Sequence, residues 1–280
     1  DMLFTVADVL PGCILVQVNM AGTSPGDVGF WNSHFRVGGA AGSAVQTKCQ
    51  TGVPCKAAFM FLHLTATSSA YIEDMWGWTA DHDLDGNFNQ LISTGRGLLV
   101  ESKLGTWLIG TAFEHHTLYQ YSFVAAENVF VSMQQSETPY WQGIGGPAQA
   151  PEPWTPSTSY SDPAFSHCNT DDANCRMAWY QRIESGSNMY IYGSGFWTFF
   201  NNVGDCKGVN GTCQDNANEI VGKPTGLFWW NVNTRGCLNV LVDNGVVVQT
   251  QNNNPGSWGA VVAATLTYSG LVSGMRRWIG

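Results

Sequence analysis

Two glutamates, Glu114 and Glu137, lie in similar strings of sequence and could act together in acid–base chemistry. The strings are TWLIGTAFEHH (106–116) and NVFVSMQQSETPYW (128–141), and the offset is 137 − 114 = 23 residues. Such a repeat is shorter than the roughly 30 residues of a βαβ unit but fits one coil of a solenoid. Neighbouring parallel strands lie about 4.8 Å apart, so the two carboxylates are expected to share one small surface. The same register pairs three further positions: Trp107 with Phe130, Leu108 with Val131 and Ile109 with Ser132.

The composition predicts that the elements positioning these glutamates are β-strands. Charged residues make up only 12% of the 280 residues, about half the usual share, whereas Gly (32) and Trp (12) are frequent. The segment 57–64 reads AAFMFLHL, typical of a buried strand, and 70–86 alternates as another strand would. Only 176–184 could form a short helix. We expect one all-β domain over 1–280.

The net charge of −9 disfavours nucleic acid and anionic membranes as partners, because no surplus of Lys and Arg is available to neutralise phosphates. An aromatic-rich acidic protein more often handles neutral ligands, carbohydrate among them. The sequence predicts no cofactor and no metal site. DHDLDG (81–86) resembles half of a calcium loop, but Ile92 stands where an EF-hand needs glutamate.

The cysteines predict an oxidising compartment, so we expect a secreted protein. Six of the eight lie in close pairs within polar segments and lack the spacing and His partners of a metal site. A glycosylation sequon begins at Asn210, inside the last of these loops. The chain opens at Asp1 in a strand-like run without a leader, which predicts a processed or truncated chain. The predicted disulfides are Cys49–Cys55, Cys168–Cys175 and Cys206–Cys213, with Cys13 and Cys237 unassigned.

A Pro-rich stretch at about 143–164 interrupts the strand pattern, because no regular element tolerates five prolines at that density. A flexible linker is one interpretation. Trp154 and Tyr160 instead favour a loop packed over the solenoid.

Long, specific strings run along nearly the whole chain and read FTVADVLPG, NMAGTSPGDVGFWNSHFRVGG, SSAYIEDMWGWTADHDLDG, ISTGRGLLVES, GTWLIGTAFEHHTLYQY, NVFVSMQQSETPYWQG and YGSGFWTFF. These strings closely resemble fungal exo-β-1,3-glucanases of glycoside hydrolase family 55. The resemblance implies a right-handed parallel β-helix, one of two that lie side by side with the active site in the cleft between them. It also implies inverting release of glucose from the non-reducing end of β-1,3-glucan. The chain is less than half of such an enzyme and resembles its second β-helix. The N-terminal β-helix, thought to position the attacking water, is then a missing partner, and this chain alone should be inactive.

The resemblance implies that Glu137 is the general acid, which glycoside hydrolysis needs to protonate the leaving oxygen. Its place between a strand and Pro139, with the sugar-stacking candidates Tyr140 and Trp141 directly after it, supports that role. Glu114 matches a second carboxylate of the family's site. We expect Glu114 to tune Glu137 rather than to attack, because a like charge nearby keeps a carboxylic acid protonated to higher pH.

Further contacts to sugar are expected from the WGWTADH string and from one of the two glutamines before Glu137. Phe196 and Trp197 are interpreted as core. Two other functions stay open: a non-catalytic β-glucan-binding module, and a polysaccharide lyase, against which the scarcity of Lys and Arg near the glutamates speaks. The candidate substrate-binding residues are Trp76, Trp78, Asp81, His82, Gln134, Tyr140 and Trp141.

Overall fold

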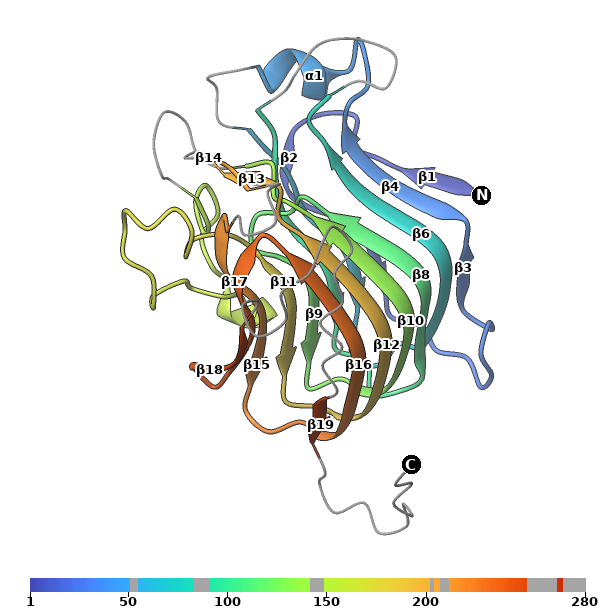
Figure 1. Ribbon diagram of the computed structural model, residues 1–280. Coiled ribbons are helices and arrows are strands. Elements are labelled where there is room, and N and C mark those ends of the chain that lie inside the picture. Colours follow the sequence, from blue (N-terminus) through green and yellow to red (C-terminus); the bar gives the residue numbers. More distant parts are fainter. Residues whose placement is uncertain are drawn as a thin grey trace.

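The computed structural model is an all-β solenoid whose coils cross two facing parallel sheets, as Figure 1 shows. It describes residues 1–50, 55–82, 91–141, 149–201, 204–206, 212–250 and 266–268. The predicted parallel β-helix class is therefore confirmed. The sequon at Asn210, positions 83–86 of DHDLDG and positions 143–148 of the Pro-rich stretch lie outside the described residues.

The first sheet, here called sheet A, has the order β1-β4-β6-β8-β10-β12-β16-β19, with β3 paired to β6. Its strands pair in parallel, except that β19 runs antiparallel to β16. The bounds are β1 Met2–Phe4, β3 Gly29–Trp31, β4 Ser33–Gly38, β6 Ala70–Ala80, β8 Thr106–Glu114, β10 Glu127–Glu137, β12 Ser187–Trp197, β16 Thr225–Arg235 and β19 Leu266–Tyr268.

Sheet B has the order β18-β17-β15-β11-β9-β7-β5-β2 and is parallel apart from β18. Its bounds are β2 Leu10–Val18, β5 Lys56–Leu64, β7 Ser93–Val100, β9 Tyr119–Val124, β11 Trp179–Glu184, β15 Gln214–Val221, β17 Cys237–Asp243 and β18 Val246–Thr250. Strand β5 confirms the buried strand predicted at 57–64. The prediction of a possible short helix at 176–184 is wrong. Residues 179–184 form β11, which pairs with β9 and β15.

Apolar side chains fill the space between the two sheets and form the main core. Burying this surface is the dominant favourable contribution to folding. Outside the sheets lie a short hairpin, β13 Phe200–Asn201 with β14 Gly204–Asp205, and a helix, α1 Ala44–Lys48. The helix was not predicted; Ser43 caps its first turn by accepting a hydrogen bond from the Gln46 amide at 3.1 Å. The three predicted disulfides are all present.

The described part of the Pro-rich stretch packs over the outer face of sheet B, as predicted from Trp154 and Tyr160. Trp154 joins a second buried apolar cluster, and its Nε1 donates to Ser93 Oγ at 2.6 Å. Arg96 of β7 forms an ion pair with Asp162, and neither side chain is exposed to solvent. A buried pair of opposite charges ties this segment, here called the strap (149–165), to the coils.

Near its middle, each long strand of sheet A bends at a residue of positive φ, and these residues are in register with one another. They lie between residue pairs that match across neighbouring strands. On β10, Val129 and Val131 are buried, and the next buried positions are Gln134 and Ser136. The bend therefore adds one residue and restarts the inward–outward alternation, as a bulge does. The five bend residues are Asp74 (φ 52°), Gly110 (63°), Met133 (64°), Gly193 (78°) and Asn231 (57°).

Candidate active site

Beyond the bends, the outward positions of sheet A form a symmetric row of side chains. The strand register pairs Arg36 with Trp78, Trp78 with Glu114, Glu137 with Trp197 and Trp197 with Arg235. Gln135 pairs with Ala112, so two residues further along both strands Glu137 comes opposite Glu114. The two glutamates therefore lie at the centre of the row, between two tryptophans and, beyond these, two arginines. In order across the sheet the row is Arg36, Trp78, Glu114, Glu137, Trp197 and Arg235.

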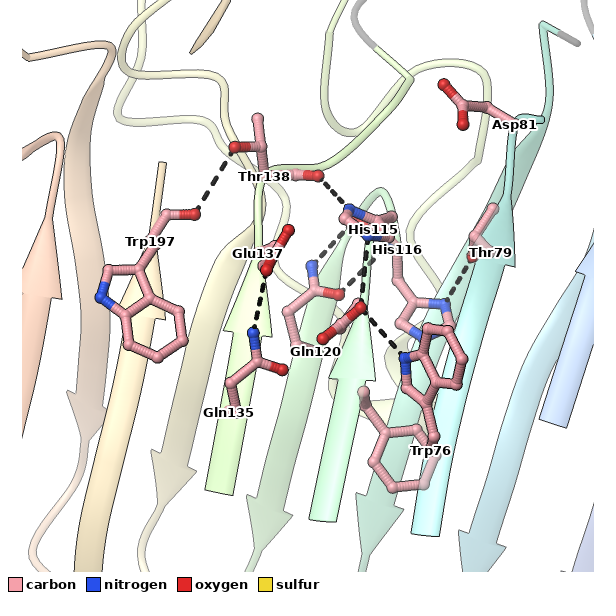
Figure 2. A network of polar contacts seen from close by, with 12 residues as sticks. Trp76, Thr79, Asp81, His115, His116, Gln120, Gln135, Glu137, Thr138 and Trp197 are labelled. Atoms are coloured by element: carbon pink, nitrogen blue, oxygen red, sulfur yellow. Dashed lines mark hydrogen bonds and ion pairs between the residues drawn. The ribbon is translucent and has the colours of Figure 1, made fainter. Parts of the chain in front are cut away.

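Glu137 ends β10 with a half-buried carboxyl that remains open to solvent. Gln135 Nε2 donates to its Oε1 at 3.3 Å, as Figure 2 shows. Burial raises the pKa of Glu137, and the Glu114 charge raises it further, while His115 and Gln135 act in the opposite direction. A carboxyl group in this setting keeps its proton to higher pH than an ordinary glutamate.

Glu114 is buried, with 7% of its surface exposed. Trp76 Nε1 donates to its Oε2 at 3.1 Å, and His115 Nε2 lies 3.4 Å from the same oxygen. Because it offers so little surface, Glu114 can influence a ligand mainly through Glu137. This geometry favours the expected tuning role over direct attack.

The two tryptophans of WGWTADH lie on β6, the strand next to Glu114. The rings of Trp76 and Trp78 stack at 4.9 Å, and His82 meets Trp78 edge-on at 5.3 Å. His82 in turn lies 2.6 Å from Asp81. Burial raises the pKa of Tyr140, and the nearby Asp81 charge adds to the effect, whereas a hydrogen bond with Trp78 opposes it. The fold therefore brings Trp76, Trp78 and Tyr140 beside the glutamates, with His82 and Asp81 following on from Trp78.

Two predicted substrate contacts require correction. Gln134 is fully buried inside the coil, where its Nε2 donates to Gln181 Oε1 at 2.5 Å and to Ser194 Oγ at 2.9 Å. Gln135 faces outward instead, because the bend at Met133 changes which residue of the pair reaches the surface. Trp141 is only 5% exposed and offers almost no ring face. Tyr140 stacks on His115, with ring centroids 3.7 Å apart.

Trp197 is the main feature that the sequence did not place correctly. Phe196 is buried in the core as expected, but Trp197 points outward next to Glu137. A Cβ on Gly195 would come within 2.6 Å of the Trp197 ring, so this glycine gives the ring room to lie along the sheet. An alignment of SGFW (194–197) with QQSE (134–137), which places Gly195 opposite Gln135 and Trp197 opposite Glu137, could have revealed the register.

A pocket of about 530 Å³ opens beside the two stacked tryptophans, towards β1 and β4. Neither glutamate lines it; both lie on the adjoining outer face of sheet A. The Arg36 guanidinium lies over the Trp78 ring at 5.4 Å, at the boundary between pocket and glutamates. The pocket is lined by Asp1, Met2, Leu3, Asn32, His34, Phe35, Arg36, Trp76 and Trp78.

Within the described residues, no helix has the length and apolar character needed to cross a membrane. The same part of the chain carries three disulfides, at the positions predicted from the cysteine spacing.

Most of the chain is similar to segments of much longer fungal proteins. A probable glucan endo-1,3-beta-glucosidase of Arthroderma benhamiae is 37% identical over 276 residues, which are 94% of this chain and 30% of that protein. A glucan 1,3-beta-glucosidase of Cochliobolus carbonum is 39% identical over 211 residues, 72% of this chain and 25% of that protein. The non-secreted LysM effector LysM15 of Penicillium expansum is 39% identical over 249 residues, 86% of this chain and 16% of that protein.

The chain thus spans less than a third of the length of each of these curated relatives. No protein-family model matches it. Two of the three relatives carry the name of a glucan-cleaving enzyme.

Proposed function

We propose that this chain is one β-helix of a β-1,3-glucan hydrolase and supplies the general acid of that enzyme. The observation that carries the proposal is Glu137: a solvent-accessible carboxyl, beside Trp197 on the outer face of sheet A, whose pKa is raised by burial and by Glu114. A general acid needs a pKa near the working pH, and the direction of this shift supports that role.

In the proposed reaction Glu137 protonates the glycosidic oxygen as the bond to the leaving sugar breaks. Trp197 lies beside it and is partly exposed, so its ring offers an apolar face to a glucose ring. Both glutamates belong to sheet A and act from one side of the bond. In an inverting reaction the water attacks from the opposite side, so its positioning groups would come from a second β-helix outside this chain. Release of glucose from the non-reducing end of the glucan, in the extracellular space, completes the proposal.

The experiment uses the full-length protein with laminarin as substrate. Glu137→Gln is expected to lower glucose release by about 10²–10⁴-fold, the usual contribution of a general acid, while laminarin binding survives. The matched control is Glu152→Gln, on the exposed surface of the strap. NMR of the first product should detect α-glucose, and the isolated 280-residue chain should release none. An unchanged rate of laminarin hydrolysis by Glu137→Gln would contradict the proposal that Glu137 is the general acid.

A second candidate is a non-catalytic module that binds β-glucan through the same aromatic row. The similarity to a protein named as a LysM effector favours this alternative. The full-length wild-type protein distinguishes the two: a module retains laminarin without releasing sugar, whereas the proposed hydrolase releases glucose from it.

A further inference from the structure

His115 contacts both strands of the acid pair. It follows β8 directly, with φ 70°, and this left-handed backbone turns its ring back over the site. Nδ1 lies 2.5 Å from the Thr138 carbonyl oxygen, one residue beyond Glu137, and Nε2 lies 3.4 Å from Glu114 Oε2. The ring stacks on Tyr140 and is 3% exposed; Figure 2 shows it between Thr138 and the end of β8.

The partners of the two ring nitrogens restrict where the protons can be. A carbonyl oxygen only accepts, so Nδ1 carries a hydrogen. If the ring is neutral, Nε2 then presents a lone pair to Glu114, and this contact is favourable only when Glu114 holds a proton. If Glu114 is ionised, the favourable partner is the imidazolium. One proton is therefore shared within the pair, and its two favourable states are imidazolium with carboxylate and imidazole with carboxylic acid.

The neighbouring groups favour the imidazolium state. Trp76 Nε1 donates to Glu114 Oε2, and a donated hydrogen bond stabilises an ionised carboxylate. The other titratable groups around the ring are Glu137, which His115 affects electrostatically, the stacked Tyr140 and the adjacent His116. Burial holds the pKa of His116 well below its usual range, and the charge of His115 lowers it further, so His116 adds no competing cation.

We infer that His115 is a positioning residue that holds the shared proton against Glu114 and fixes the backbone beyond Glu137. It thereby partly cancels the Glu114 charge felt by Glu137 and sets the pH range in which Glu137 stays protonated. The inference deepens the proposed function, since its consequence for catalysis rests on Glu137 being the acid. The proton arrangement itself does not depend on catalysis.

The test is an NMR titration of the 280-residue chain, which needs no activity. Imidazole ¹⁵N shifts should show both His115 nitrogens protonated at a pH where Glu114 is ionised. In Glu114→Gln the ring should lose its second proton at lower pH than in the wild type. This variant leaves His115 in place, so the test does not depend on tolerance of a substitution at residue 115.

The second arm follows the ¹³C carboxyl signal of Glu137. His115→Asn suits the left-handed backbone and keeps an amide donor. It should raise the Glu137 titration midpoint by about 0.5–1 pH unit, because Glu114 then acts uncompensated. The same substitution should have little effect in the Glu114→Gln background. Equal midpoints in the wild type and His115→Asn, or a neutral ring whenever Glu114 is ionised, would overturn the inference. Loss of hydrolysis alone, with these titrations as expected, would count against the proposed function instead.

Discussion

Glu137 of β10 and Trp197 of β12 are direct register partners across neighbouring strands, although 197 − 137 = 60 residues separate them in the chain. The strap and the Cys168–Cys175 loop lie within this interval. Because the insertions project from the coil, the strands on either side still align, and an aromatic ring reaches the side of the acid that faces away from Glu114.

Trp197→Ala should weaken laminarin binding by about tenfold, which corresponds to roughly 1.4 kcal/mol. The ring is partly exposed, so the midpoint of thermal unfolding should change little. Binding measured by affinity electrophoresis in laminarin gels would check this. The control is Trp230→Ala: Trp230 is 43% exposed on β16, on the other side of the bend, and should not contribute. Equal losses in the two variants would indicate a non-specific effect of removing aromatic surface.

Glu137→Gln should stabilise the chain at neutral pH. The folded-state pKa of Glu137 is raised, chiefly by burial, so its contribution to stability is complete below the unfolded-state pKa and is lost as the pH rises through the folded-state value. Glutamine avoids that loss. We expect a gain of about 1–3 °C in melting temperature at pH 7 that disappears towards pH 4. A gain of the same size at both pH values would contradict a titration of Glu137 as its cause.

Asp162→Asn should be among the most destabilising substitutions in the described part of the chain. It leaves the Arg96 guanidinium buried without a compensating charge, at an expected cost of about 3–5 kcal/mol in the free energy of unfolding. Urea unfolding followed by tryptophan fluorescence would measure it. The matched control is Asp8→Asn, which removes an exposed ion pair with Lys48 and should produce no measurable change. A mild effect at residue 162 would mean that the strap does not depend on this pair.

The requirement for a left-handed residue at each bend can be tested by two substitutions whose expected effects on stability differ. Gly110→Val places a β-branched residue at φ 63° and should destabilise the chain by about 1–2 kcal/mol or more. Met133→Gly removes a side chain that is 49% exposed from a left-handed position, so it should be neutral or slightly stabilising. Gly12→Ala is the control, since a Cβ there meets no atom within 4 Å. If Gly110→Val were as mild as this control, the left-handed backbone would not be required.

The coil repeat could be recognised in the sequence only where the offset between neighbouring strands of sheet A is shortest. The 23-residue offset predicted the pairs Trp107–Phe130, Leu108–Val131 and Ile109–Ser132, and the structure confirms all three. The neighbouring coils are longer, with offsets of 114 − 78 = 36, 197 − 137 = 60 and 235 − 197 = 38 residues. Insertions of different lengths hide the repeat there, which is why Trp197 was interpreted as core.

The error at Gln134 has a different physical origin. Simple alternation along β10 does not show where a left-handed residue interrupts it, and Met133 gives no such signal because it is neither glycine nor asparagine. Asn231, Gly110 and Gly193 occupy the same position on three other strands and could have suggested the bend. That inference needs the inter-strand alignment, which the insertions conceal.

A bend restarts the inward–outward alternation within each sheet A strand. The direction in which side chains point after the bend, where Glu114 and Glu137 lie, therefore does not depend on the length of the chain before it. A residue gained or lost between coils, or in the first half of a sheet A strand, leaves Glu114, Glu137 and their flanking tryptophans facing the same way. Loops can therefore lengthen, acquire a disulfide or lose a proline while this end of the strands keeps its side chains.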